Sequence, residues 1–264
     1  MSTLKIPCSV EILTRNSALT LERCLESVKD FAEIIILDGN STDETLEIAG
    51  KYGCRIYKQY ETSEPEIRIK NYAEVRNKGL ELANYDWFMY IDADEYLSVE
   101  AAEEIRSVVE NPQPEFFVWW QPRKYVLDGK IIDCATTYPN QQIRFFHKKA
   151  VKQFIKPIHE KIEVLAGKSA GALKSFELIP LEELTSLQEK WQGYLNLEKE
   201  RLVGLSRSKI ILGMLYTLKT ILIFLFRLIK NFIFCQGKHM PVSYELARQG
   251  YNFSILFMLF RRLV

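Results

Sequence analysis

Short apolar runs alternate with helical segments in the first third of the chain. The most restrictive run is 33–38, where four aliphatic residues stand between Glu33 and Asp38. A continuous apolar run of this length is typical of a strand buried on both faces of a parallel sheet. Further strands are predicted at 8–14, 55–58 and 87–91, and helices at 19–28, 45–52 and 68–83. The alternation predicts an α/β fold with a doubly wound, Rossmann-like, mostly parallel sheet.

The pattern changes after residue 97. A helix predicted at 98–110 is followed by apolar strands at 116–120, 143–146 and 158–164, with proline and glycine in the surrounding loops. Strands that follow one another without intervening helices are expected to pair in antiparallel or mixed fashion. We therefore predict a smaller mixed sheet here, followed by a polar helix at 181–205.

Polar side chains stand where three of the predicted parallel strands end. They are Thr14, Asp38 and Asp92. Ligands bind open α/β sheets at the carboxyl ends of the strands. The topology alone therefore predicts that these three residues meet at one edge of the sheet and form a binding site there.

The stretch Asp92-Ala93-Asp94-Glu95 directly follows the apolar strand 87–91. Carboxylates one residue apart repel each other and lose hydration at a strand end, and both costs are reduced by a bound cation. Mg²⁺ and Mn²⁺ prefer hard oxygen ligands and bridge phosphates. The stretch therefore predicts a divalent metal site and chemistry on a phosphorylated substrate. The alternative is a solvated acidic turn that caps the next helix.

Charge is distributed unevenly along the 264 residues. Apolar content of 47% and charged content of 26% are ordinary for a globular protein. The net charge of +1 combines +9 over residues 201–264 with −8 over residues 1–200. The basic part is also apolar, which favours an anionic membrane surface over nucleic acid, since no aromatic stacking platform accompanies the charges. The alternative is a helical cap whose lysines face water.

Two apolar segments in this tail bear on how it meets a membrane. Residues 210–226 are interrupted by Lys219, and residues 251–260 are closed by Arg261 and Arg262. A spanning helix needs about 20 apolar residues, and 210–226 is slightly shorter. We expect helices that lie in or against the membrane interface, with a re-entrant or spanning hairpin as the alternative.

The five cysteines are scattered along the chain, and none forms a Cys-x-x-Cys pair. They are Cys8, Cys24, Cys54, Cys134 and Cys235. This spacing predicts neither a zinc site nor a disulfide framework, and it fits a reducing compartment. The first ten residues contain one lysine and no long apolar stretch, so no signal peptide is expected.

Several motifs in order give the chain its resemblance to the family 2 glycosyltransferases of GT-A fold. Those in the first half are Thr14-Arg15-Asn16, 38–45 (Asp-Gly-Asn-Ser-Thr-Asp-Glu-Thr), 73–79 with Arg76-Asn77, and 92–95. Ser17 stands where the family often has an acid. Downstream, Tyr138-Pro139, 142–146 and Ile158-His159-Glu160 resemble the lipopolysaccharide core heptose β-1,4-glucosyltransferases.

The resemblance implies transfer of a sugar from a nucleoside diphosphate sugar, with UDP-hexose expected, to a hydroxyl of a cell-envelope glycolipid or polysaccharide precursor. A divalent cofactor, Mn²⁺ or Mg²⁺, and inversion of stereochemistry are expected. Asp94 is the expected direct metal ligand, and Asp92 is expected to contact ribose or a metal-bound water. His159 is a third candidate ligand or an orienting residue. Glu160 is the expected general base that takes the acceptor proton.

Further substrate contacts follow from the same resemblance. Asp38 is expected to accept from the base or ribose, with an N-cap role as the alternative. Arg15 and Arg76 are expected to pair with phosphate or with the acids, and Arg144 with diphosphate or an anionic acceptor. Thr14 and Asn16 complete the predicted donor-binding set.

The resemblance also implies a domain organisation and a location. Residues 1–110 are predicted to bind the nucleotide sugar, 111–180 to form the acceptor half, and 181–264 to associate with the membrane. The expected location is the cytoplasmic face of the inner membrane, peripheral or monotopic. Two alternatives remain: a non-catalytic glycolipid-binding or scaffold relative, and a sugar nucleotidyltransferase, although residues 14–17 lack the glycine-rich loop of the latter.

Overall fold

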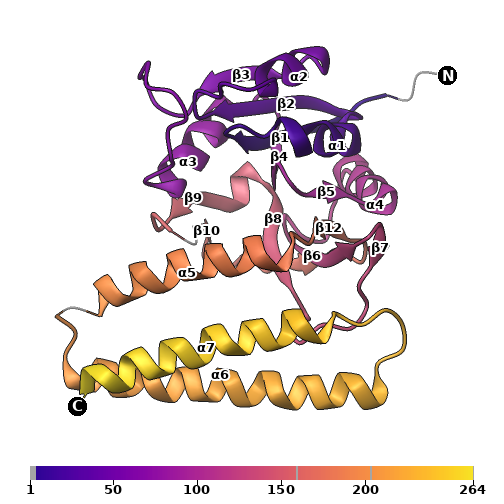
Figure 1. Cartoon of the computed structure of the whole chain (residues 1–264). Helices are drawn as coiled ribbons and strands as arrows, with labels where there is room; N and C mark the ends of the chain where they lie inside the picture. Colours follow the sequence, from indigo (N-terminus) through magenta and orange to yellow (C-terminus); the bar gives the residue numbers. More distant parts are fainter. Residues whose placement is uncertain (1–3, 159, 203, 264) are drawn as a thin grey trace. The chain divides into compact units, whose positions relative to one another are not determined.

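The computed structural model describes residues 4–158, 160–202 and 204–263 (Figure 1). The chain forms two compact units. The sheet unit comprises Met1–Lys124 and Pro139–Pro180, and the helical unit comprises Tyr125–Tyr138 and Leu181–Val264. The segment 125–138 therefore belongs to the same unit as the C-terminal helices. The sequence did not indicate this assignment. The three predicted functional regions stay predictions.

The sheet unit is built on four parallel strands in the order β3-β2-β1-β4. Their bounds are β1 Ile6–Thr14, β2 Phe31–Asp38, β3 Arg55–Lys58 and β4 Trp87–Asp92. The helices of this region are α1 Ala18–Val28, α2 Thr45–Lys51, α3 Tyr72–Leu82 and α4 Val99–Glu110. The predicted alternation and the mostly parallel sheet are confirmed.

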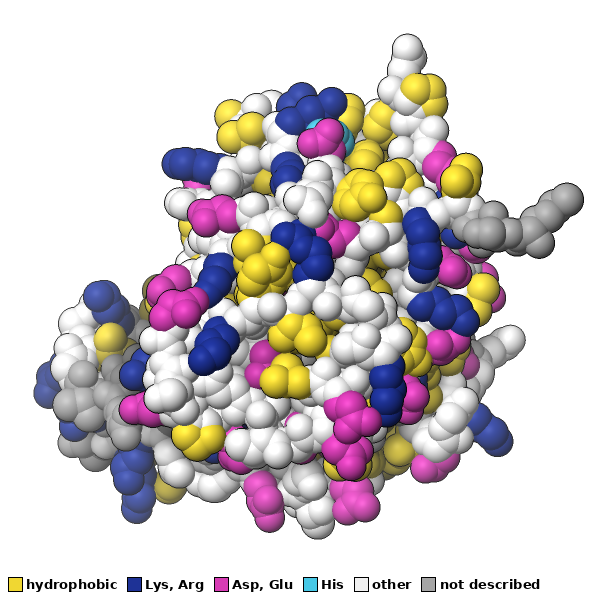
Figure 2. Space-filling model, turned by 90° about the horizontal axis from the view of Figure 1, so that it is seen from above, with side chains coloured by type: hydrophobic (Ala, Val, Ile, Leu, Met, Phe, Trp, Pro, Cys, Tyr) yellow, Lys and Arg dark blue, Asp and Glu magenta, His cyan; other side chains and the backbone are white. Residues whose placement is uncertain are grey.

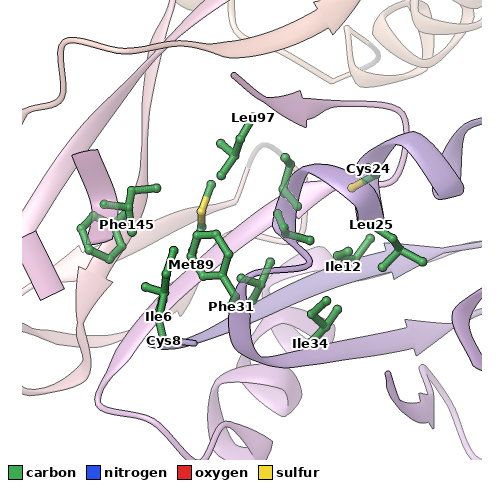
Figure 3. Close-up of a cluster of buried hydrophobic side chains, with 14 of the residues drawn as sticks. Ile6, Cys8, Ile12, Cys24, Leu25, Phe31, Ile34, Met89, Leu97 and Phe145 are labelled. Carbon is green, nitrogen blue, oxygen red and sulfur yellow. The ribbon is translucent and has the colours of Figure 1, made fainter. Parts of the chain in front are cut away.

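Both faces of β1, β2 and β4 are largely buried, whereas the edge strand β3 is half-exposed. On one face Ile34 and Ile36 of β2 join a core that α1 and α4 cover. Figure 3 shows Ile12 of β1 and Met89 of β4 in this core, together with Leu25 of α1. On the other face the cluster of buried apolar side chains is covered by α3 and by β9 (Val151–Ile155), which lie side by side in Figure 1.

Helix α3 begins later than the sequence predicted. The apolar spacing indicated a helix from residue 68, but the first helical residue is Tyr72. Asn71 has extended backbone angles and its side chain accepts a hydrogen bond from the Glu74 amide. This is the N-cap arrangement that asparagine favours. The preceding loop instead pairs with the end of β2, where the Ile67 amide donates to the Gly39 carbonyl.

The predicted change to mixed pairing is confirmed, although these strands extend the parallel sheet and do not form a smaller sheet of their own. Strand β8 (Gln141–His147) pairs antiparallel with β4 and with β6 (Val118–Leu127). The sheet continues through β12 (Glu177–Pro180) and β5 (Tyr96–Leu97), with short strands β7 (Lys130–Ile131) and β11 (Gly171–Ala172) beside β6. A separate hairpin joins β9 to β10 (Lys161–Val164), which the sequence predicted as a longer strand from residue 158.

The helical unit contains α5 (Leu184–Arg201), α6 (Arg207–Phe234) and α7 (Val242–Leu263). A disulfide joins Cys134 to Cys235, the residue that follows α6. The expectation that the cysteines form no disulfide is therefore wrong. The partners are 101 residues apart and share no spacing motif, so only the folded chain shows that they meet. The cysteine-based argument for a reducing compartment is lost with it.

Helix α6 is longer than the predicted apolar segment. Its 28 residues extend about 42 Å, enough for the roughly 30 Å hydrocarbon core of a bilayer. Within the described part of the chain it is the one helix long and apolar enough to cross a membrane, and only 17% of its most apolar window is buried. The expectation that this segment falls short of a span is corrected.

Acidic and basic side chains are interspersed on the face of the molecule seen in Figure 2. Hydrophobic side chains occur there in small groups between them. A mixture of both signs is typical of a solvated surface.

Candidate active site

The carboxyl ends of β1 and β2 meet as predicted. Thr14 and Asp38 are register partners, and the Thr14 hydroxyl donates to Asp38 Oδ1 over 2.7 Å. Ser41 donates twice more to this carboxylate, from its amide over 2.8 Å and from its hydroxyl over 2.6 Å. Asp38 is only 4% exposed. A carboxylate accepts about four hydrogen bonds, so three bonded donors leave acceptor capacity for a ligand.

Hydrogen bonds join the loop after β1 to the loop after β2. Asn16 takes up a left-handed backbone conformation with φ of 48°, and its side chain accepts from the Thr42 amide over 2.8 Å. Its own amide donates to the Ser41 hydroxyl. Non-glycine residues in this region store strain that is common at functional sites. Arg15 is exposed beside this loop.

Asp92, at the carboxyl end of β4, lies between two guanidinium groups. Arg76 of α3 donates to its Oδ1 over 2.7 Å, and Arg144 of β8 donates to its Oδ2 over 2.8 Å. Both guanidinium groups lie over the Tyr90 ring, 4.5 and 5.0 Å from its centroid. Burial acts to raise the pKa of Asp92, but Arg144 and Arg76 hold that pKa below its usual range. Asp92 is therefore a fixed anion.

The predicted general base also faces this cluster. A Glu160 carboxylate oxygen lies 3.6 Å from Nε of Arg76. The Glu160 side chain is 17% exposed, so solvent or a substrate can reach it. His159, the predicted third metal ligand, lies outside the described residues. Asp94 is exposed, two residues beyond Asp92.

Three charged residues of the cluster were missed by sequence reasoning: Glu11, Arg123 and Glu177. Arg123 forms an ion pair with Glu95, and its Nε lies 3.5 Å from Glu177. Arg144 lies 3.1 Å from Glu95 and 3.4 Å from Glu177, so it links this group to Asp92. Burial raises the pKa of Glu95, Arg144 opposes this, and Glu177 reinforces it.

The cluster holds more acid than base. Among the described residues, five carboxylates meet three guanidinium groups. The acids are Glu11, Asp92, Glu95, Glu160 and Glu177, and the bases are Arg76, Arg123 and Arg144. The exposed Asp94 adds a further negative charge beside them. Burial raises the pKa of Glu11 and of Glu95 and so favours their neutral forms, which leaves the exposed Asp94 as the acid best placed to bind a cation.

The donor atoms fit a hard divalent cation. Within the described residues, no three His, Cys, Asp or Glu side chains come together to hold a metal ion on their own. Mg²⁺ commonly binds through one or two carboxylates, with water and substrate phosphate as its remaining ligands. The exposed Asp94, supported by the anion of Asp92, offers this kind of partial ligand set.

Comparison with known families agrees with this site. The model of glycosyl transferase family 2 matches residues 9–162, a range that includes Asp38, Asp92, Asp94 and Glu160. The chain belongs to the family 2 glycosyltransferases.

Sequence identity to individual curated proteins is low. An uncharacterized glycosyltransferase of Rickettsia bellii is 31% identical over 53% of this chain and 46% of its own length. A lipopolysaccharide core biosynthesis glycosyltransferase, LpsC of Rhizobium meliloti, is 27% identical over 71% of this chain and 69% of its own length. The match spans only 22% to 48% of the length of several curated relatives, the Rickettsia bellii protein among them.

Solved structures are related at low identity. S. aureus TarS in complex with UDP-GlcNAc is 16% identical over 97% of this chain and 81% of its own chain, with a TM-score of 0.47. Glucosyl-3-phosphoglycerate synthase of Mycobacterium tuberculosis, in complex with Mn²⁺, UDP and glucosyl-3-phosphoglycerate, is 24% identical over 46% of this chain and 44% of its own, with a TM-score of 0.33.

Proposed function

We propose that this chain transfers a sugar from a nucleoside diphosphate sugar to a hydroxyl of a membrane-bound glycan precursor. The observation that carries the proposal is the edge of the sheet where Asp38 and Asp92 end the two parallel strands that flank β1. Asp38 retains acceptor capacity for the base or ribose of the donor. The acids at 92–95 are then proposed to face the diphosphate that is attached to this ribose. Membership of family 2 supports the reaction class.

In this proposal Asp94 holds a divalent cation, Mn²⁺ or Mg²⁺, together with water and the diphosphate. The cation, when bound, supplies Lewis-acid neutralisation of the charge that develops on the leaving diphosphate. Arg76 and Arg144 keep Asp92 ionised and fixed in orientation. A fixed anion costs no reorganisation during the reaction, which is the advantage of a preorganised site.

Glu160 is proposed as the general base. Its carboxylate is reachable from solvent and oriented by Arg76 at 3.6 Å. A carboxylate placed within hydrogen-bonding reach of the acceptor hydroxyl takes its proton as the hydroxyl attacks the sugar. Attack from the face opposite the leaving diphosphate inverts the anomeric centre. Arg15 is proposed to contact the phosphates.

We propose that α6 and α7 bind a membrane surface that carries the acceptor. Apolar side chains along α6 are exposed, among them Leu222 at 58% and Phe226 at 67%. The region is also strongly basic, as binding to anionic lipid requires. The similarity to a lipopolysaccharide core enzyme supports a cell-envelope glycolipid as acceptor. The cytoplasmic face is proposed because charged nucleotide sugars do not cross a bilayer unaided.

The donor site is tested with UDP-glucose, UDP-GlcNAc and UDP, each with and without Mn²⁺. A ligand that binds the native state raises the melting temperature, and it does so more the tighter it binds. We expect stabilisation by UDP with Mn²⁺ and slow release of UDP from one sugar nucleotide. Asp94→Asn should lower this release by about 100-fold or more, since the lost ligand stabilises the leaving charge. Asp86→Asn, just before the other end of β4 and also exposed, is the matched control.

The proposal fails if neither UDP nor a sugar nucleotide stabilises the chain in the presence of Mn²⁺. It also fails if Asp94→Asn and Asp86→Asn release UDP at the same rate.

Membrane binding is tested with vesicles of anionic and of zwitterionic lipid. The full chain should pellet with the anionic vesicles, and less so at high salt. Leu222→Glu combined with Phe226→Glu should weaken pelleting, because both exposed side chains would otherwise enter the interface. Leu19→Glu, at a fully exposed leucine of α1, is the control. Equal pelleting of the two variants would contradict the assignment of α6.

A further inference from the structure

Glu11 is a buried acid in β1, the strand that lies between β2 and β4 in the parallel part of the sheet. It lies in β1 between Val10 and Ile12, and its exposed fraction is 0%. Neither of its carboxylate oxygens has a hydrogen-bond partner among the described residues. Burying an unbonded carboxyl group costs several kcal/mol by order of magnitude. Packing alone would be better served by an apolar residue here, so the acid needs another explanation.

The charged group nearest to Glu11 is Arg76. Its Nη1 lies 3.5 Å from Glu11 Oε1, and the arginine side chain is only 1% exposed. The same guanidinium lies 2.7 Å from Asp92 and 3.6 Å from Glu160. Arg76 is thus the group that joins the centre of the sheet to the two acids of the proposed site.

The helix that carries Arg76 leaves room for Glu11. Gly79 of α3 lies so close that a Cβ atom there would come within 2.6 Å of Glu11 Cδ. Gly79 lies three residues after Arg76, and therefore on the same side of α3. The close approach of helix and strand sets the distance between Glu11 and the guanidinium.

We propose that Glu11 is a positioning residue: its Oε1, 3.5 Å from Nη1, is a polar partner that fixes Arg76, and through Arg76 it fixes Asp92 and Glu160. Glu11 itself touches neither donor nor acceptor. Without this oxygen the guanidinium keeps two acidic partners, Asp92 and Glu160, both at the partly solvated edge, and gains freedom to move toward either. The inference rests on the proposed function for its activity readout, and a second readout is independent of it.

The activity test uses Glu11→Met and Glu11→Gln in the full chain, with UDP release from the sugar nucleotide as the assay. Methionine has a similar length but no acceptor oxygen, so kcat should fall by about 10- to 100-fold while the donor KM changes by less than about threefold. Glutamine keeps an acceptor oxygen and should restore most of kcat. Glu33→Gln, at another buried acid of the same sheet, should leave kcat near the wild-type value.

The second readout is the position of Arg76 itself. In protein labelled with ¹⁵N-arginine, the Nε–H signal of Arg76, assigned with Arg76→Lys, should exchange slowly in the wild type. It should shift and exchange faster in Glu11→Met, but stay near its wild-type position in Glu11→Gln and Glu33→Gln. A purely structural role for Glu11 would change stability without moving this signal.

Wild-type kcat in Glu11→Met, or no recovery in Glu11→Gln, would overturn the inference. An unchanged Arg76 signal in Glu11→Met would overturn it as well. If the wild type neither binds UDP with Mn²⁺ nor releases UDP from any sugar nucleotide, the proposed function fails. The Arg76 signal then still decides whether Glu11 positions the guanidinium.

Discussion

Two buried acids on the same sheet, Glu33 of β2 and Glu11 of β1, have opposite surroundings. Glu33 accepts hydrogen bonds from Ser9, from Arg55, and from both the amide and the side chain of Asn84. Burial acts to raise its pKa, yet these donors hold the pKa of Glu33 below its usual range. Burial raises the pKa of Glu11 to about 8, with Arg76 opposing it.

This difference in hydrogen bonding distinguishes Glu33, which stabilises the fold, from Glu11, which we propose serves the active site. A buried polar group that is fully hydrogen-bonded can hold a fold together, whereas a partly satisfied one lowers stability. Glu33 lies near the amino end of β2, away from the ligand edge. Glu11 belongs to the cluster that reaches Asp92, where its cost is offset by fixing Arg76 in the proposed active site.

Removing Glu33 should have the largest effect on stability. Glu33→Ala leaves Asn84, Ser9 and Arg55 without their acceptor, and we expect the free energy of unfolding to fall by about 3 kcal/mol. Urea unfolding followed by circular dichroism measures this. UDP release per folded molecule should stay unchanged. A stability loss smaller than that of an exposed control, Glu103→Ala, would contradict the claim that Glu33 stabilises the fold.

The pH dependence of stability should distinguish the two acids next. The pKa of Glu11 rises from 4.5 to about 8 on folding, so the native state binds more protons between these values. Its contribution therefore makes stability fall as pH rises from about 5 to about 8, by up to about 1.4 kcal/mol per pH unit, and then level off. Glu11→Gln should flatten this slope in urea titrations. An identical slope in wild type and variant would contradict the assigned burial effect.

The smallest expected change is a gain in stability in Glu11→Met. Glu11→Met removes a buried, unbonded carboxyl group and keeps the volume, so stability should rise by about 1 kcal/mol while activity falls. Thermal unfolding at pH 7 measures the gain. A loss of stability as large as that of Glu33→Ala would show that Glu11 is a structural acid too.

Sequence reasoning reached the fold and the ligand edge because both depend on local patterns. Continuous apolar runs predicted β2 and β4, and the strand ends at Thr14, Asp38 and Asp92 meet in the observed register. The start of α3 was misplaced because the asparagine cap outweighs apolar spacing at its N-terminus.

The charge cluster depends on contacts that no local pattern contains. Arg76 meets Glu11 and Glu160, which are 65 and 84 residues away in sequence, and the disulfide joins residues 101 apart. One local signal was present: an acid between Val10 and Ile12, inside a strand with no other charged residue. Its partner could be identified only once α3 was placed against β1.

The central claim is that the acidic end of β4 binds the diphosphate of a sugar nucleotide through a divalent cation. Anomalous diffraction from crystals soaked with UDP and Mn²⁺ tests it most directly. The account predicts a manganese peak beside the Asp94 carboxylate, with the UDP diphosphate next to it and Asp92 still held by Arg76 and Arg144. UDP bound with no manganese beside Asp94, or manganese and UDP bound elsewhere in the molecule, would contradict it.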